Sequence, residues 1–310
     1  MDESEEDNIK IIIGPFIITN KQLGDGTSGS VRLGIHEGTK ESVAIKEIRK
    51  KKYEIISERI SNNELEEIKN ERELLDSTLL EQEIEIFKIL HHPYICRYYY
   101  KANYNSDYYI VSEYLKNKNI IDYIYDSLEK EDITFNIFDE KFICKIFCQM
   151  LSAIEYMHNN YIVHRDIKLE NTIFDEYGDI KLTDFGFSKK LKKGEYLQDH
   201  RGSEIYSSPE VIIYQNDYDG YLADIWSLGV CLFFLIFKDY PFSNDAQDFK
   251  EKLRDSDLTF PEAEASDLVK DLIKKILEKN PKKRINIAQI KQHPWLKTIN
   301  FDFNKSRGIY

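Results

Sequence analysis

The hydrophobic period of the chain changes near residue 120, and this change constrains the fold more than any other sequence feature. From Ile9 to Lys46, short apolar runs are separated by glycines, which is typical of antiparallel strands joined by tight turns. After residue 120, apolar residues recur every three or four positions, which is typical of amphipathic helices. The sequence therefore predicts an α+β protein with a smaller β-rich unit followed by a larger, mostly helical one.

The same patterns assign individual segments. The polar residues 116–119 separate the two regions and predict the boundary between the units. The expected strands are residues 9–13, 16–19, 30–36, 41–48, 94–100, 106–115, 161–164, 172–174 and 180–183, and the expected helices are residues 79–90, 139–158, 221–237, 245–254, 266–279 and 286–291.

Composition excludes several classes of protein. With 42% hydrophobic residues, the 310-residue chain can bury a large core, so it is not a disordered protein. Its net charge of −12 argues against a broad basic surface for nucleic acid. The acidic N-terminus is no signal peptide, and the apolar run Val230 to Phe237 is short for a membrane span. We expect a cytoplasmic, monomeric protein that binds neither membrane nor nucleic acid, with access to the nucleus left open.

The four cysteines, Cys96, Cys144, Cys148 and Cys231, lie among apolar residues. They are too few to form the disulfide framework of a chain of this length. Cys144 and Cys148 could share one helix face as half of a metal site, but the sequence shows no second half. We therefore expect buried, reduced thiols.

A glycine-rich run, GDGTSGSV, extends from Gly24 to Val31. Strands are expected on both sides of it, whereas a dinucleotide-binding fold would place a helix after the last glycine. Glycines let a backbone approach phosphates closely, so the run is compatible with a phosphate-binding loop. By itself the run is more typical of an ordinary glycine-rich hairpin.

Lys46 ends the apolar strand VAIK. Burying its ammonium is costly unless the charge meets a phosphate or a carboxylate. Glu83, ten residues before Pro93 on an expected helix, is the candidate carboxylate. The alternative is that Lys46 is an exposed lysine at a sheet edge.

The segment HRDIKLEN, residues 164–171, carries the strongest chemical signal. Asp166 can orient a hydroxyl group and accept its proton, and Lys168 can neutralise a phosphoryl group in transfer. Asn171 and Asp184, which lies 13 residues further on in the triplet DFG, offer oxygen ligands for a hard cation. Each triplet alone could occur by chance, but their order and spacing together could not.

With these motifs in this order, the chain resembles a eukaryotic protein kinase of the serine/threonine type from about Phe16 to Leu296. The segments HPYICRYYY, SEYL, DFGFSKKL and HPWL are most similar to the calcium/calmodulin-dependent group, near the AMP-activated and sucrose-non-fermenting-related kinases. The resemblance implies a bilobal fold with an N-lobe at 16–115 and a C-lobe at 116–296. It leaves short tails at 1–15 and 297–310.

The resemblance also implies ATP and Mg²⁺ as cofactors and assigns roles to individual residues. Glu210 should pair with Arg284, Asp224 should brace the loop that holds Asp166, and Ser203 should bond Asp166 and Lys168. The implied catalytic residues are Asp166, Lys168, Lys46 and Glu83. The implied ATP-binding residues are Leu23, Gly24, Gly26, Gly29, Val31, Ala44, Lys46, Glu113, Leu115 and Ile173, and the implied metal ligands are Asn171 and Asp184.

The implied activity is transfer of the γ-phosphate of ATP to Ser or Thr hydroxyls of protein substrates in intracellular signalling. The alternative is a catalytically silent, kinase-like scaffold that binds nucleotide. Such scaffolds usually lose Lys46, Asp166 or Asp184, and this chain retains all three. The segment GSEIYSSPE, which resembles a peptide-binding segment, disfavours a small-molecule kinase.

Two departures from the family pattern concern the length of the chain and its charge. Lys46 and Glu83 are 37 positions apart, more than the resemblance implies, so residues about 50–75 are expected to be a charged insertion. It is either a solvated segment or a partner-binding element.

Asp199 stands where relatives phosphorylate a threonine. We hypothesise that Asp199 pairs with Arg165 and Lys189 and partly replaces a phosphate. The alternative is that Asp199 points into solvent.

Two further departures concern ligand specificity. Ser112 aligns with the residue at the back of the adenine pocket, where relatives carry a larger side chain, so a deeper pocket is expected. Residues 117–119, Asn-Lys-Asn, replace a Gly-Gly-Glu whose glutamate contacts ribose or a basic substrate residue. This change weakens the expectation of a strong preference for arginine upstream of the acceptor, although Glu170 is retained.

Overall fold

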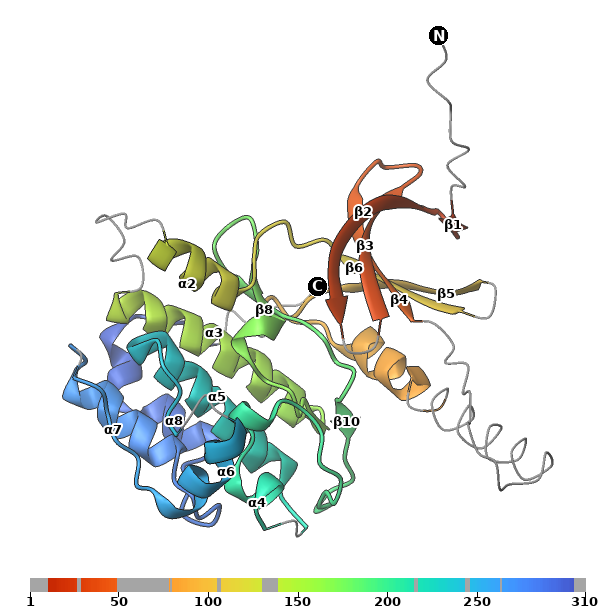
Figure 1. The fold of residues 1–310 in the computed structure, drawn as a ribbon. Coiled ribbons are helices and arrows are strands. Elements are labelled where there is room, and N and C mark those ends of the chain that lie inside the picture. Colours follow the sequence, from red (N-terminus) through yellow and green to blue (C-terminus); the bar gives the residue numbers. More distant parts are fainter. Residues whose placement is uncertain are drawn as a thin grey trace, which may run out of the picture. The chain divides into compact units, whose positions relative to one another are not determined.

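The computed structural model describes residues 11–26, 29–48, 78, 80–104, 107–129, 139–214, 217–242, 246–262 and 264–303. The chain divides into two compact units, one of residues 1–90 with 97–115 and one of residues 91–96 with 116–310 (Figure 1). The acidic residues 1–8 and the expected insertion at about 50–75 lie outside the described residues.

The first unit is built on an antiparallel sheet, as the glycine-punctuated strands predict. Ile12–Ile13 already pair with β2, so regular structure begins before Phe16, the expected start of the domain. The described strands, in spatial order, are β1 (Ile12–Ile13), β2 (Phe16–Gly26), β3 (Gly29–His36), β4 (Ser42–Ile48), β6 (Asp107–Glu113) and β5 (Tyr98–Tyr104).

The strand expected at 94–100 begins later than predicted. The β5 strand starts at Tyr98 because the preceding residues pair elsewhere. Cys96 donates its backbone N–H to Leu182, and Leu182 donates to Tyr94, so this segment lies along β9 (Ile180–Leu182) of the second unit. A local apolar pattern cannot distinguish between these two pairing partners.

Alternation along β4 separates its two faces. Val43 and Ile45 are buried in a core with residues of β1, β2 and β6. Ala44 and Lys46 point to the opposite face, and Lys46 meets a glutamate of the helical residues 80–89 that is described below. The helix follows the sequence expectation of 79–90 closely.

Helices and short hairpins build the second unit, as the sequence predicts. Its two central helices, α3 (Glu140–Asn159) and α5 (Gly220–Phe237), pack against each other in one large apolar core. The other described helices are α2 (Ile120–Glu129), α4 (Pro209–Ile212), α6 (Ala246–Asp255), α7 (Asp267–Ile276) and α8 (Ile287–Gln292), and the short strands are β7 (Ile162–Val163), β8 (Thr172–Phe174), β9 and β10 (Lys189–Lys190) (Figure 1).

The apolar stretch of α5 is longer than the run of Val230 to Phe237 on which the sequence argument relied. By length and composition alone, the 18 residues Gly220–Phe237 could cross a membrane. However, 72% of them are buried inside the second unit, as in the core helix of a folded domain. Asp219 caps the helix by accepting hydrogen bonds from the backbone of Tyr221 and Leu222.

All four cysteines are free and buried, as the sequence predicts. The thiol of Cys144 on α3 donates to the carbonyl of Trp295 at 3.7 Å. Among the described residues, no cluster of three or more His, Cys, Asp and Glu side chains could hold a metal ion.

Candidate active site

Lys46 and Glu83 form an ion pair in the first unit. Lys46 Nζ lies 3.0 Å from Glu83 Oε1, and the two side chains are 16% and 9% exposed. The predicted pair is therefore present, and the alternative of an exposed edge lysine is wrong. Because the pair is largely shielded from water, each charge depends on the other for its solvation. The lysine ammonium is thereby held in one direction.

The glycine-rich run lies at the ends of β2 and β3, in the strand–turn–strand context that the sequence predicts. Gly24 has open space where a Cβ atom would lie. At Gly29 a Cβ atom would come within 2.0 Å of the carbonyl oxygen of Glu47, so only glycine lets β3 approach β4 so closely here. Thr27 and Ser28 lie outside the described residues.

The register of the sheet gathers the other candidate ATP-binding residues of the first unit. Val31 lies opposite Lys46, and Ala44 lies opposite Ser112. Partners that face each other across antiparallel strands share one face of the sheet. Glu113 ends β6, where its backbone N–H donates to Arg97 O and its carboxylate accepts from Arg97 N. The half-buried Leu23 and Leu115 belong to the same unit.

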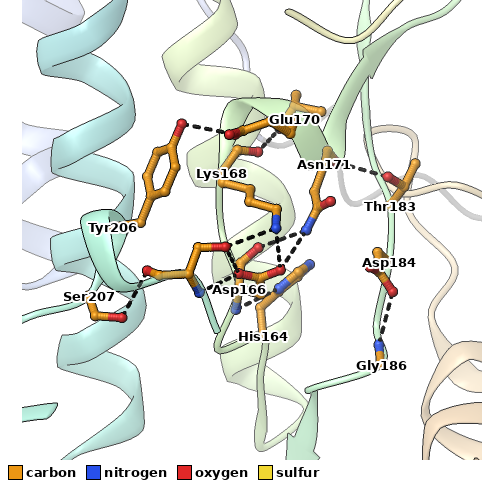
Figure 2. A network of polar contacts seen from close by, with 12 residues as sticks. His164, Asp166, Lys168, Glu170, Asn171, Thr183, Asp184, Gly186, Tyr206 and Ser207 are labelled. Carbon is orange, nitrogen blue, oxygen red and sulfur yellow. Dashed lines mark hydrogen bonds and ion pairs between the residues drawn. The ribbon is translucent and has the colours of Figure 1, made fainter. Parts of the chain in front are cut away.

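The loop 164–171 of the second unit is organised around the carboxylate of Asp166 (Figure 2). Its Oδ1 atom accepts from the backbone N–H and the hydroxyl of Ser203, both at 2.9 Å. Its Oδ2 atom lies 2.9 Å from Lys168 Nζ and accepts from Asn171 Nδ2 at 3.1 Å. Charged and neutral donors thus surround a carboxylate that is only 5% exposed, and they set its orientation.

Lys168 links this carboxylate to Ser203. Its ammonium donates to Ser203 Oγ at 2.9 Å as well as contacting Asp166. The predicted contact of Ser203 with both Asp166 and Lys168 is confirmed. Gly202 makes it possible, because a Cβ atom there would lie 2.2 Å from the carbonyl oxygen of Arg165.

Asn171 and Asp184 are joined through Thr183. Thr183 donates its backbone N–H and its hydroxyl to the carbonyl of Asn171, at 2.9 and 3.0 Å. Asp184 follows directly, with a left-handed backbone (φ 58°) and a half-buried side chain (Figure 2). Such a conformation is uncommon outside glycine and typical of functional sites. Ile173, the remaining candidate ATP-binding residue, is half-buried on β8 of the same unit.

Asp224 on α5 holds the loop 164–171 through backbone hydrogen bonds, as predicted. This buried carboxylate accepts the backbone N–H groups of His164 and Arg165, both at 2.9 Å. His158 contacts its Oδ2 atom at 2.8 Å, a partner that the sequence analysis missed.

His164 is itself fully buried, and this burial lowers its pKa. Its Nδ1 atom accepts the N–H of Asp166 at 3.3 Å.

Asp199 forms an ion pair with Arg165. Arg165 Nη1 reaches both carboxylate oxygens at 2.8 and 2.9 Å, and Arg165 Nε donates to the carbonyl of Phe187. The expected contact of Asp199 with Lys189 is wrong, because Lys189 pairs with Glu195 at 3.0 Å. Arg201 is the second partner instead, at 3.2 Å. Burial opposes ionisation of Asp199, but the arginine charges outweigh it and lower the pKa of Asp199.

The remaining predicted pair consists of Glu210 and Arg284, which lie after Ser203 in the sequence. Arg284 binds Glu210 through Nη1 and Nη2, at 2.6 and 2.9 Å, with its side chain fully buried. Its guanidinium also lies 4.9 Å from the ring centroid of Trp226. The exposed Glu170 accepts a hydrogen bond from Tyr206 at 2.9 Å. The predicted Glu210–Arg284 contact is therefore confirmed.

The donor set of the second unit fits a magnesium–nucleotide complex. Hydrogen bonds from Asn171 Nδ2 to Asp166 leave the amide oxygen of Asn171 as its available ligand atom. The carboxylate of Asp184 supplies a second oxygen donor. Mg²⁺ typically takes one or two protein oxygens and completes its shell with water and phosphate. Asn171 and Asp184 are oxygen donors of the kind that such an arrangement uses.

Comparison with known proteins identifies the family to which the chain belongs. A model of the protein kinase domain matches residues 17–296. The chain belongs to the protein kinase family.

Individual relatives of this kinase agree with the predicted subgroup. It is 36% identical to the serine/threonine-protein kinase SIK1 of Rattus norvegicus over 91% of the chain. It is 36% identical over 95% of the chain to the SNF1-related protein kinase catalytic subunit alpha KIN12 of Arabidopsis thaliana. It is 34% identical over 91% of the chain to the SNF-related serine/threonine-protein kinase of Homo sapiens. The predicted resemblance to sucrose-non-fermenting-related kinases is confirmed.

The matches cover only part of these relatives. They span 33% of rat SIK1, 33% of the human SNF-related kinase and 54% of the Arabidopsis protein. The comparison therefore concerns the kinase domains of these longer proteins.

Gly202 and Arg201 contact residues of the candidate site, but sequence reasoning did not single them out. The signal for Gly202 was present in the sequence, since a glycine directly before Ser203 indicates a close backbone approach. Arg201 gave no such signal, because charged residues on a loop are commonly solvated.

Proposed function

We propose that the protein is a serine/threonine protein kinase that transfers the γ-phosphate of ATP to hydroxyl groups of protein substrates. The observation that carries this proposal is the oriented carboxylate of Asp166, with Lys168 and Asn171 on its Oδ2 atom and Ser203 on Oδ1. Family membership and the retention of Lys46, Asp166 and Asp184 support the same activity.

Asp166 would orient the hydroxyl of the substrate and accept its proton. The donors around Asp166 hold its carboxylate in a single direction, so a hydroxyl that binds it is positioned without further rearrangement. In phosphoryl transfer such positioning contributes much of the catalysis. Lys168, with its ammonium 2.9 Å from Asp166, would stabilise the charge of the phosphoryl group in transfer.

Lys46 would bind the α- and β-phosphates of ATP. Its pairing with Glu83 holds the ammonium in place, and a positive charge so held is suited to an anionic ligand. Asn171 and Asp184 would hold Mg²⁺, which neutralises phosphate charge when bound. The main chain at Glu113 and Leu115 would receive the adenine, and Gly24 would let the backbone approach the phosphates.

We further propose that Asp199 supports activity without phosphorylation at this position. Arg165 immediately precedes Asp166 and has a left-handed backbone (φ 68°). Its side chain is 9% exposed, and a buried guanidinium needs an anionic partner. Asp199 supplies that anion permanently, three residues before Gly202, and so holds the segment that delivers Ser203 to Asp166.

The test of the proposed activity uses the purified protein with ATP, Mg²⁺ and a positional library of Ser/Thr peptides. We expect turnover that falls by on the order of 10²-fold or more in Asp166→Asn. ATP with Mg²⁺ should still raise the melting temperature of that variant, because Asp166 is not a proposed ATP ligand. Asp248→Asn, which alters an exposed carboxylate on α6, is the matched control.

Two results would contradict the proposal. One is wild-type protein that is stabilised by ATP but phosphorylates no peptide, which would indicate a nucleotide-binding scaffold. The other is Asp166→Asn with turnover equal to that of wild type.

A further inference from the structure

A lysine-rich turn, residues 189–195, stands out on this acidic protein. Lys190, Lys192 and Lys193 are exposed, and none of the three forms an ion pair within the part of the chain that the structure describes. The chain as a whole carries a net charge of −12. Three neighbouring unpaired ammonium groups therefore make a local positive site on a negative molecule.

The backbone of the lysine-rich turn is anchored at its start. Lys189 and Lys190 of β10 pair with Val163 and Ile162 of β7. Leu191 donates its N–H to Tyr161 O at 2.7 Å, and its side chain is 4% exposed in a cluster completed by Val163, Leu197, Val211 and Tyr218. The one apolar side chain of the turn thus points inward while the lysines point outward.

Glu195 closes the turn at its other end. Its carboxylate accepts the backbone N–H of Lys192 at 2.8 Å and pairs with Lys189 at 3.0 Å. Gly194 adopts the left-handed conformation (φ 77°) that the tight turn requires. Because the backbone is already ordered, a ligand that binds the lysines pays little to order it.

The lysine-rich turn pairs with residues that lie just before the loop 164–171, which carries Asp166. Val163, the partner of Lys189, precedes Asp166 by three residues. At about 3.3 Å per extended residue, the lysines are on the order of 10 to 20 Å from Asp166. One polypeptide could therefore place an acceptor hydroxyl at Asp166 and a second segment on the turn.

We propose that the lysine-rich turn docks an acidic segment, rich in Asp and Glu, of the protein substrates; this rests on the proposed kinase function. Exposed lysines are compact, hydrated charges, so the attraction is weak and sensitive to salt. It acts by raising the local concentration of a tethered acceptor. A small cluster on a chain of net charge −12 suits a short acidic peptide better than a nucleic acid, which needs many phosphate contacts.

The test compares two peptides with the same acceptor serine and the same flexible tether. One ends in a run of Asp and Glu and the other in Asn and Gln. We expect wild-type enzyme at low salt to show a KM about tenfold lower for the acidic peptide, at equal kcat. The triple variant Lys190→Ala, Lys192→Ala, Lys193→Ala should lose this preference. The triple variant Lys282→Ala, Lys283→Ala, Lys297→Ala removes the same charge from exposed lysines elsewhere and should retain it.

Fluorescence anisotropy of the labelled acidic segment alone separates this proposal from the proposed function. Binding that depends on the three lysines, in a protein without kinase activity, would contradict the kinase function and support the docking surface. Equal peptide preference in the wild type and the lysine-turn variant would overturn the docking proposal. So would tighter binding of a single-stranded oligonucleotide than of the acidic peptide.

Discussion

Arg165 and Asp199, 34 residues apart, are joined by two hydrogen bonds from the same guanidinium nitrogen, Nη1. The pair links the residue before the candidate base to the segment that carries Ser203. We expect Asp199→Asn to reduce kcat of the unphosphorylated enzyme by about 10- to 100-fold, because the segment loses its anchor. Peptide phosphorylation after phosphatase treatment measures this effect.

Controls separate a positioning role of Asp199 from a general loss of structure. Asp199→Glu should recover most of the activity, and Glu176→Gln, which alters an exposed carboxylate on the β8–β9 turn, should have none of the effect. Turnover of Asp199→Asn equal to that of wild type would show that the pair is dispensable.

The buried His92 predicts acid-sensitive stability. Burial lowers its pKa from the ordinary 6.5 to about 4, because the charged form is poorly solvated; the positive charge of Lys181 adds to this effect. The unfolded chain therefore takes up a proton at pH values where the folded protein does not. The contribution of neutral His92 is complete above pH 6.5 and is lost progressively between pH 6.5 and about 4.

Thermal unfolding at pH 7.5 and pH 5.0 checks this expectation. His92→Gln should be less stable at pH 7.5, since the contacts of the ring with Ser152 and Tyr156 are lost, but it should lose less stability on acidification than wild type. An identical pH dependence in both proteins would show that another group controls acid sensitivity.

Ser208 carries a buried hydroxyl that is energetically unfavourable. Its Oγ atom has no hydrogen-bond partner within the described ranges, and the residue is 0% exposed. Removing an unsatisfied buried group is neutral or stabilising, so Ser208→Ala should raise the free energy of unfolding by about 0 to 1 kcal/mol. Urea denaturation measures this change in the free energy of unfolding. A decrease of more than about 1 kcal/mol would reveal a partner for the hydroxyl.

The buried pair of Glu210 and Arg284 predicts strongly non-additive mutations. Glu210→Gln leaves the guanidinium without its counter-charge and should destabilise the protein by about 3 to 5 kcal/mol. Combining Glu210→Met with Arg284→Leu removes both charges and should cost less than either single change to an uncharged residue. Additive losses in a double-mutant cycle would contradict this account.

Ser112 predicts the size of the adenine-binding pocket. It lies on β6 opposite Ala44, on the same face as Lys46. Ser112→Met would fill the space that a small side chain leaves, so the affinity for purine analogues with bulky substituents should fall by about tenfold or more while the KM for ATP changes little. Unaltered analogue affinity would show that Ser112 does not line the pocket.

Much of the candidate site could be predicted because its residues are close along the chain. Asp166, Lys168 and Asn171 lie within six positions, so almost any loop keeps them near one another. The alternation along β4 likewise placed Lys46 and Ala44 on one face. In contrast, residues 94–96 carry the same apolar pattern as a strand of the first sheet and yet lie along β9.

The chemical groups that are present and the periodicity of each element are local properties of the chain, so they can be read from the order of the residues. Which distant charges meet depends on the folded arrangement. Asp199 pairs with Arg165 and Arg201 rather than Lys189, because the turn at Gly194 brings Glu195 back to Lys189. Only Gly202 lets its segment touch the carbonyl of Arg165. Such contacts depend on how loops close over many residues, which no local pattern records.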